Sequence, residues 1–313
     1  MRAVTIKDKQ LTVEHHPDPV PGSGEVLVKV HAAGLNGADM HQLAGHYPAP
    51  PGSPQDIPGL ELAGEIVDRG PGAERFEVGD RVMSIVGGGG QAELATVNER
   101  ILMPVPDSLS WPEAGGLPEV FTTAHDAVFT QAGLVVGERL LVHGAAGGVG
   151  CAAVQLGRAA GARVTASVRN TDLRARVAEF GADVVAHDDF QDRGPFDVIL
   201  ELVGAVNLID NLKVLNTGGR IAVIGTGAGA TGEINLGLVM MKRARIHGST
   251  LRSRPLELKA LTARAMERSV LPLLAAGEVK VTLAKTYPLA EAPAAYEHFQ
   301  RGGKLGKIVL TMD

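Results

Sequence analysis

The chain has 313 residues, of which 45% are hydrophobic and 21% are charged, and its formal net charge is −5 at pH 7. This length favours two domains over one, and the composition excludes extensive disorder. The negative balance leaves no global positive field to recruit nucleic acid, so we expect no nucleic-acid partner.

The first 120 residues have the pattern of a β-rich domain. Short strand-like runs span residues 25–30 and 62–67, and a turn within residues 76–80 precedes another strand. The segment 47–58 is rich in proline and predicts a loop.

Beyond this point apolar strands alternate with helices. The predicted strands span residues 139–143, 163–168, 183–185, 196–200 and 220–224. One predicted helix spans residues 151–160, and a second ends at Phe180. Strands joined by helical crossovers form a parallel, doubly wound sheet, so the predicted fold class is α/β. After about residue 255 follow a helical stretch, the run Val279-Lys280-Val281 and a terminal strand over residues 307–310.

Two features indicate a reducing compartment away from membranes. Cys151 is the only cysteine, which excludes an intrachain disulfide. Charges within Met1–Lys9 stand where a signal peptide needs an apolar core, and no apolar run is long enough to cross a bilayer. We therefore expect a cytoplasmic protein without a membrane partner.

The most informative motif is a glycine-rich turn between a predicted strand and a predicted helix, Gly144-Ala145-Ala146-Gly147-Gly148-Val149-Gly150. Gly144 permits the tight turn out of the strand. Gly147 and Gly148 let the backbone approach a pyrophosphate, and Gly150 lets the helix pack close to the sheet. Free amides at the helix start then face the phosphates. A turn without a ligand is the alternative, and the flanking strand and helix favour the dinucleotide.

The end of the second strand of this region distinguishes NADPH from NADH. NAD enzymes usually place an acid there for the adenosine ribose, whereas this chain has Ser167-Val168-Arg169-Asn170 and no acid before Asp172. Ser167 can hydrogen-bond a 2′-phosphate and Arg169 can clamp it. The alternative is that Arg169 is a solvated loop residue. The predicted cofactor is NADPH.

Further motifs extend along nearly the whole chain. They are Gly34-Leu35-Asn36, Pro58 to Gly64, Gly79-Asp80-Arg81-Val82, Pro118 to Ala124, Gly218-Gly219-Arg220 and Gly248 to Arg254. Together with the cofactor turn, they make the sequence resemble the zinc-independent quinone oxidoreductase branch, which includes zeta-crystallin, of the medium-chain dehydrogenase/reductase superfamily.

The resemblance implies a specific domain organisation. Residues 1–121 would form the first part of a GroES-like, β-rich barrel domain for substrate, and residues 122–254 a Rossmann domain for NADPH. Residues 255–313 would return to complete the barrel domain. The substrate cleft would lie between the two domains, and members of the branch are commonly homodimers joined through their nucleotide-binding sheets.

Zinc is not expected. The alcohol dehydrogenases of this superfamily hold a catalytic zinc with Cys, His and Cys, and the matching positions here are Asn36, Leu60 and Glu119. A catalytic zinc needs three suitable protein ligands, and this set cannot supply them. The four-cysteine structural zinc lobe is also missing, with Gly87-Gly88-Gly89-Gly90 in roughly that region.

Without a Lewis acid, direct hydride transfer to an acceptor that is already electron-poor is the expected reaction, with a quinone or another α,β-unsaturated carbonyl as substrate. Tyr47 lies in a loop that matches the cleft lining of the branch, and its hydroxyl could bond a quinone oxygen. Asn36 could orient the acceptor carbonyl. The alternatives are that Tyr47 packs against the proline-rich loop and that Asn36 ties down its own turn.

The candidate cofactor contacts come from the turn, from strand ends and from a position that approaches the nicotinamide in the superfamily. They are Thr123, Ala146, Gly147, Gly148, Val149, Ser167, Arg169, Val203, Gly204, Gly225 and Thr226. Arg252 and Arg254 could support the cleft, reach a phosphate or face solvent. Two other functions stay open: reduction of enoyl thioesters, and a non-catalytic NADPH-binding sensor, scaffold or RNA-binding protein.

Overall fold

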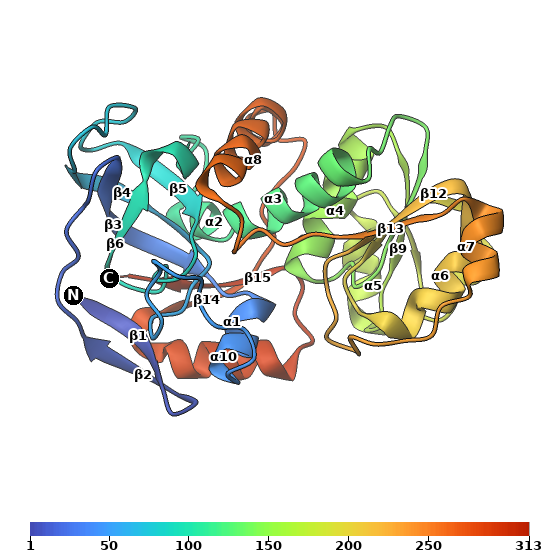
Figure 1. Ribbon diagram of the computed structural model, residues 1–313, viewed down its shortest axis with the longest axis horizontal. Coiled ribbons are helices and arrows are strands. Elements are labelled where there is room, and N and C mark those ends of the chain that lie inside the picture. Colours follow the sequence, from blue (N-terminus) through green and yellow to red (C-terminus); the bar gives the residue numbers. More distant parts are fainter. Residues whose placement is uncertain (313) are drawn as a thin grey trace.

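The computed structural model describes residues 1–312 and has two parts, each built on its own sheet (Figure 1). The first part holds the N-terminal hairpin and a seven-stranded sheet that includes the C-terminal strands. The second part holds a six-stranded sheet with helices around it. The predicted α/β class and the pairing of a β-rich part with a doubly wound part are confirmed.

The strands of the first part alternate buried and more exposed side chains. In the longest one, Val26, Val28 and Val30 face the core, as the two-residue period of a strand requires. Its strands are β3 (Glu25–Gly34), β4 (Glu61–Arg69), β5 (Arg81–Ile85), β6 (Leu94–Asn98), β7 (Met103–Pro104), β14 (Leu283–Pro288) and β15 (Lys307–Thr311), beside the hairpin β1 (Arg2–Lys7) and β2 (Gln10–His15). Its helices are α1 (Gly37–Leu43), η1 (Glu99–Ile101), α2 (Trp111–Gly115), η5 (Leu289–Glu291) and α10 (Ala292–Arg301).

The C-terminal strands return to the first sheet. Strand β15 pairs antiparallel with β3, so that Val309 lies opposite Gly34, and β14 pairs parallel with β15. The run Val279-Lys280-Val281 lies outside these strands, since β14 begins only at Leu283. The backbone of Lys280 bonds a side chain rather than a neighbouring strand. Its N–H donates to Oε1 of Gln155, and its C=O accepts from Nε2 of the same side chain.

The second part has the strand order β10-β9-β8-β11-β12-β13, with all neighbours parallel. The strands are β8 (Arg139–Val142), β9 (Arg163–Ser167), β10 (Asp183–Val185), β11 (Phe196–Glu201), β12 (Leu215–Val223) and β13 (Arg245–Gly248). The helices are α4 (Gly148–Ala159), α5 (Thr171–Ala178), η3 (Phe190–Arg193), η4 (Ala205–Asn207), α6 (Leu208–Val214) and α7 (Leu236–Lys242). The strand order reverses between β8 and β11, where sheets of this type bind ligands.

Two elements of the second part begin earlier than the sequence predicted. Helix α4 begins at Gly148 rather than at residue 151, because the glycine-rich turn supplies its first residues. Strand β12 begins at Leu215 rather than at residue 220, and its register against β11 is irregular.

Helices connect the two parts into one core. They are α3 (Pro118–His125), the π-helical turn η2 (Asp126–Gln131), α8 (Leu256–Ser269) and α9 (Leu271–Ala275). A single apolar cluster contains Met83 of β5, Phe121 of α3, Leu140 of β8 and Met266 of α8. The two parts therefore pack through a shared core, which fixes the walls of the space between them. Within residues 1–312, no helix combines the length and hydropathy that a membrane span requires.

Candidate active site

A cavity of about 750 Å³ lies between the two parts. Its walls include Gly147 and Gly225 from the second part and Tyr47 and Leu60 from the first. It therefore opens at the carboxyl ends of β8 and β12, beside the reversal of strand order.

The start of helix α4 forms one wall of this cavity. Gly147 is its N-cap and brings no capping side chain, and the first turn, Gly148 to Gly150, has amides without acceptors inside the helix. These amides and the helix dipole favour an anion in the cavity. Gly150 must stay without a side chain, since a Cβ there would lie 2.5 Å from the carbonyl oxygen of Gly144.

The predicted cofactor residues separate into two groups. Six line the cavity: Thr123, Gly147, Gly148, Val149, Gly225 and Thr226. Five lie outside its lining: Ala146, Ser167, Arg169, Val203 and Gly204. Five residues of the first group come from the second part, and Thr123 lies on α3, which joins the two parts.

Ser167 and Arg169 lie differently at the end of β9. The Ser167 side chain is buried, and its hydroxyl lies 3.4 Å from Nδ1 of His143. Arg169 is exposed, and among residues 1–312 its guanidinium has no hydrogen-bond partner. Arg169 is thus the group that is free to meet a ligand on the surface.

A buried polar network explains the position of Val203 and Gly204. Both backbone amides donate to Oε1 of Glu201, at 2.7 Å and 2.9 Å. The other oxygen of Glu201 accepts from Nδ2 of Asn211, whose Oδ1 lies 2.7 Å from Nε2 of His143. This network holds the loop after β11 in place, and a single polar residue at the end of an apolar strand was its only sign in the sequence.

A second buried network lies in the wall formed by the first part. The ammonium of Lys307 lies 2.6 Å from Oε1 of Glu61 and donates to Oδ1 of Asn36 at 2.7 Å. The Asn36 amide donates to the same carboxylate at 2.9 Å and to the carbonyl of Gly34 at 3.3 Å. The side chain of Asn36 is therefore fully engaged with protein groups. This fits the alternative that Asn36 ties down its own turn rather than orienting an acceptor.

Two more carboxyl groups lie near this ion pair. Asp39 is fully buried and accepts from the amides of Asn36 and Gly59, and burial raises its pKa to about 6. Glu119 lines the cavity, and burial together with the charge of Glu61 raises its pKa to about 8. Sequence patterns pointed to Glu119 only as a candidate metal position, and they gave no signal for Glu61, Asp39 or Lys307.

Arg252 shapes the part of the cavity that Tyr47 lines. It is 2% exposed and donates to the carbonyls of Gly87 and Tyr47 and to Oε1 of Gln42, at 2.7 Å, 3.0 Å and 2.5 Å. Its guanidinium also lies 5.1 Å from the centre of the Tyr47 ring. Burial raises the pKa of Tyr47, so its hydroxyl keeps its proton. Arg252 supports the cleft, and Arg254 pairs with Asp126 rather than facing solvent.

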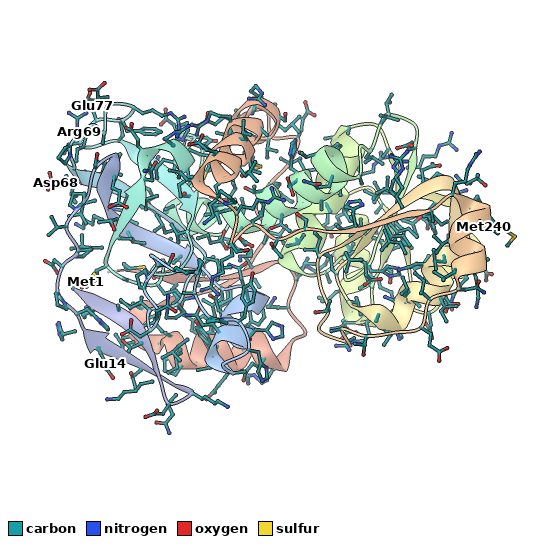
Figure 2. All side chains as sticks on the ribbon, viewed as in Figure 1. Met1, Glu14, Asp68, Arg69, Glu77 and Met240 are labelled. Carbon is teal, nitrogen blue, oxygen red and sulfur yellow. The ribbon has the colours of Figure 1, made fainter. Side chains whose placement is uncertain are left out.

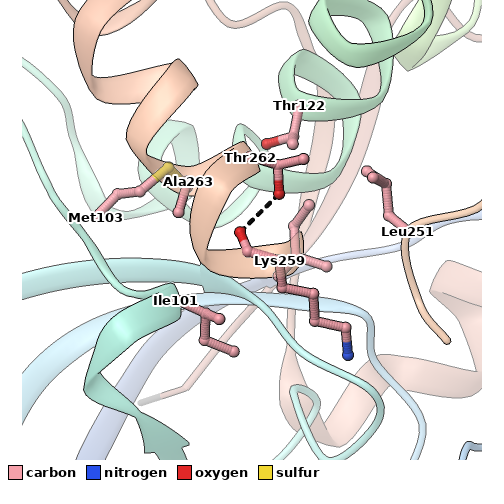
Figure 3. A pocket seen from close by; sticks show the side chains of 8 residues that line it. Ile101, Met103, Thr122, Leu251, Lys259, Thr262 and Ala263 are labelled. Carbon is pink, nitrogen blue, oxygen red and sulfur yellow. Dashed lines mark hydrogen bonds between the residues drawn. The ribbon is translucent and has the colours of Figure 1, made fainter. Parts of the chain in front are cut away.

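A small second cavity of about 10 Å³ lies behind Leu251, which also lines the large one (Figure 3). Thr122 and Lys259 line it, and the hydroxyl of Thr122 has no partner in the described chain. A space of this size is close to what one water molecule needs. It is too small for a substrate.

Comparison with known proteins assigns the family. The profile of the alcohol dehydrogenase GroES-like domain matches residues 22–107, and the zinc-binding dehydrogenase profile matches residues 178–310. Quinone oxidoreductase from Rattus norvegicus is 34% identical over 307 residues, which cover 94% of this chain and 91% of the relative. The chain belongs to the quinone oxidoreductases of the medium-chain dehydrogenase/reductase superfamily.

Solved structures agree with this assignment. The crystal structure of AibC has a TM-score of 0.87 and 30% identity to this chain. The match covers 100% of this chain and 96% of the AibC chain. The crystal structure of the CurK enoyl reductase has a TM-score of 0.86 and 25% identity. That match covers 100% of this chain and 99% of the CurK chain. As a quinone oxidoreductase family member, the protein is an oxidoreductase that depends on a pyridine nucleotide.

Proposed function

We propose that this protein reduces quinones or other α,β-unsaturated carbonyls with NADPH, by direct hydride transfer and without zinc. The observation that carries the proposal is the composition of the cavity of about 750 Å³ between the two parts. A helix N-terminus suited to phosphates forms one wall, and the phenol of Tyr47 stands in the other. When bound, NADPH supplies the hydride, and the protein supplies position and electrostatics.

The residues of the cavity fit a dinucleotide. The amides from Gly148 to Gly150 would bind the pyrophosphate, because they lack acceptors and the adjacent Gly147 adds no side chain. Gly225 and Thr226 would border the nicotinamide half together with Thr123 of α3. At Gly225 the close packing itself excludes a side chain, since a Cβ would lie 2.3 Å from the carbonyl oxygen of Leu202.

Arg169 supports NADPH over NADH. Strand β9 ends at Ser167 without the acid that accepts hydrogen bonds from an adenosine ribose, and a carboxylate there would repel a 2′-phosphate. Arg169 is exposed directly after this strand, so it can clamp the phosphate with charge-assisted hydrogen bonds. Because Ser167 is turned toward His143, we assign the larger part of the preference to Arg169.

The donor groups at the matching metal positions support a reaction without zinc. Asn36, Leu60 and Glu119 do line one cavity, but Leu60 offers no donor atom and Oδ1 of Asn36 already accepts from Lys307. The Lys307 ammonium would repel a divalent cation. Among residues 1–312, no group of three or more His, Cys, Asp or Glu side chains is arranged to hold a metal. These residues do not fit a catalytic zinc ion.

Tyr47 is the group we assign to the acceptor. It lines the cavity, and its hydroxyl has no hydrogen-bond partner within the part of the chain that the structure describes. Arg252 holds the ring and the loop, which orients the hydroxyl. We assign Asn36 the role of positioning Lys307 and Glu61 beside the acceptor.

Enoyl thioesters are the second candidate class of acceptor. The likeness to the CurK enoyl reductase favours it, since that structure covers the whole of this chain. An enoyl thioester is also an α,β-unsaturated carbonyl, so the same hydride transfer would apply.

We further propose that two copies associate along the outer edge of the nucleotide-binding sheet. Strand β13 ends the sheet there, and its free edge and the adjoining helix expose apolar side chains. They are Leu236, Met240, Met241 and Ile246, of which Met240 is 75% exposed and points outward from α7 (Figure 2). A second copy would cover this edge and extend the sheet.

A panel of acceptors tests the proposed function. Purified protein is mixed with NADPH or NADH and with quinones, enones and enoyl thioesters, and the absorbance of the reduced nicotinamide is followed. We expect turnover of quinones and enones with NADPH at a higher kcat/KM than with NADH. Tight NADPH binding without turnover of any acceptor would instead favour a non-catalytic binding protein.

A further inference from the structure

Glu119 stands where the two parts of the protein meet, and the proposed hydride transfer leaves it without a role. It lies in the first turn of α3 and lines the large cavity together with Asn36 and Thr123. Its Oε1 accepts one long hydrogen bond, from Oγ1 of Thr123 at 3.5 Å. Its Oε2 has no partner in residues 1–312 and is shielded from bulk solvent. An unpartnered buried carboxylate would be costly, whereas a neutral carboxylic acid is tolerated.

Burial and the charge of Glu61 favour the neutral acid of Glu119. The titratable and charged groups near Glu119 come from several elements and are Asp39, Tyr47, Glu61, Arg252, Lys259 and Lys307. Lys307 is bound to Glu61 at 2.6 Å, and Arg252 is bound to Gln42 and to backbone carbonyls. Burial first, and then the charge of Glu61, raise the pKa of Glu119 to about 8. At neutral pH the group therefore carries a proton beside the space for the acceptor.

Building on the proposed reduction of an activated carbonyl, we propose that Glu119 donates the proton that completes the reaction. Hydride adds two electrons and one hydrogen to the β-carbon of an enone, which forms a C–H bond and leaves an enolate. The O–H bond of Glu119 then breaks, and its proton forms the second C–H bond at the α-carbon. The products are the saturated carbonyl, the oxidised nicotinamide and the Glu119 carboxylate. A proton from solvent restores the acid.

Two acceptors separate the proton step from the hydride step. An enone such as methyl vinyl ketone must take a proton at carbon to complete the reaction. An electron-poor quinone such as 2,6-dichloro-1,4-benzoquinone yields a hydroquinone anion that is stable in water, so its reduction needs no acid from the protein. Loss of the proton donor should therefore slow the enone selectively.

The test compares the wild type with Glu119→Gln and with Glu278→Gln, an exposed control with no side-chain hydrogen bond in the described structure. For Glu119→Gln we expect kcat/KM for the enone to fall at least about 100-fold, the usual size of an acid–base contribution, and that for the quinone to stay within about 3-fold. The control should behave as wild type. Equal enone rates in Glu119→Gln and wild type would overturn the role of Glu119. A wild type that reduces neither acceptor would overturn the proposed function itself, and this inference with it.

A second measurement does not depend on turnover or on the variant. The infrared band of a protonated carboxyl group should be present in the cofactor-free wild type at pH 6 and disappear as pH passes about 8, the pKa of Glu119. The component that titrates near pH 8 should be absent from Glu119→Gln, in which Asp39, with its pKa of about 6, leaves only a component that is lost at lower pH. In the wild type, kcat/KM for the enone should fall above the same pH while that for the quinone stays flat. A Glu119 that is fully ionised at pH 6, or an enone rate that stays level to pH 9, would overturn the inference.

Discussion

Lys307 and Glu61 form an ion pair at 2.6 Å, and their side chains are 4% and 0% exposed. The pair joins the first residue of β15 to the first residue of β4, so it connects the C-terminal return to the wall of the cavity. The stem of Lys307 also packs against α4, since a Cβ at Gly148 would lie 2.8 Å from it. One side chain thus links the wall of the cavity that the first part forms to the start of helix α4.

Removal of the Lys307 charge should destabilise the protein. Lys307→Met leaves Glu61 buried without its cation, which typically costs about 3–5 kcal/mol of unfolding free energy. Lys280→Met is a matched control, because Lys280 is exposed. Denaturant unfolding measures both, and the double variant Lys307→Met, Glu61→Gln should recover part of the loss. An unchanged stability of Lys307→Met would contradict the buried pair.

Arg169 should determine the preference for NADPH. Arg169→Ala removes the proposed phosphate clamp and should raise the Kd for NADPH about 10- to 100-fold, as expected for a lost charge-assisted contact of about 1.5–3 kcal/mol. The Kd for NADH should change little. Arg163→Ala, at the exposed start of the same strand, is the control. Fluorescence titration with both nucleotides checks the prediction, which fails if the two affinities fall equally.

Two glycines of the cofactor turn should respond differently to alanine. A Cβ at Gly150 would lie 2.5 Å from the Gly144 carbonyl oxygen, so Gly150→Ala should lower the melting temperature by several degrees. A Cβ at Gly147 meets nothing closer than 3.4 Å, and the backbone there is extended. Gly147→Ala should therefore keep its stability and bind NADPH at least about tenfold more weakly, because its methyl group enters the phosphate site. Thermal melts and titrations together separate the effects; a Gly147→Ala protein with wild-type affinity would argue against phosphates at this turn.

Tyr47 should contribute one hydrogen bond to the acceptor. Tyr47→Phe keeps the ring beneath Arg252 and removes the hydroxyl, so kcat/KM for a quinone should fall about tenfold, equivalent to roughly 1.4 kcal/mol. Tyr287→Phe is the control, since that hydroxyl lies 2.9 Å from Nδ1 of His298 and outside the cavity. Steady-state kinetics decide between the roles, and an unaltered kcat/KM would assign Tyr47 to packing.

The apolar edge of the second part should mediate self-association. Met240→Glu places a charge among the exposed apolar side chains of α7, and we expect it to weaken a dimer without unfolding the monomer. Sedimentation velocity over a concentration series measures the change. Val20→Glu, at an exposed apolar residue of the first part, should leave the dimer intact. A monomeric wild type would exclude this assembly under the conditions used.

Much of the second part could be predicted from the sequence because its signals are local. The turn from Gly144 to Gly150 and the apolar runs of β8 and β11 depend on neighbouring residues, and the structure has them where the pattern indicated. The short run at Val279 carried no such local signal, because the partner of Lys280 is the side chain of Gln155, 125 positions away in the chain.

The polar wall of the cleft could not be found in this way. Asn36 and Lys307 are separated by 271 positions, and only the insertion of β15 beside β3 brings them together with Glu61. No local period encodes that meeting, and the burial that raises the pKa of Glu119 arises only when both parts pack around α3. The amino-acid sequence by itself determined most parallel strands of the second part, the glycine-rich turn and the family, because these rest on local geometry and residue type. Only the tertiary structure decided which polar groups share a buried space, because charge and desolvation act through distance in space rather than along the chain.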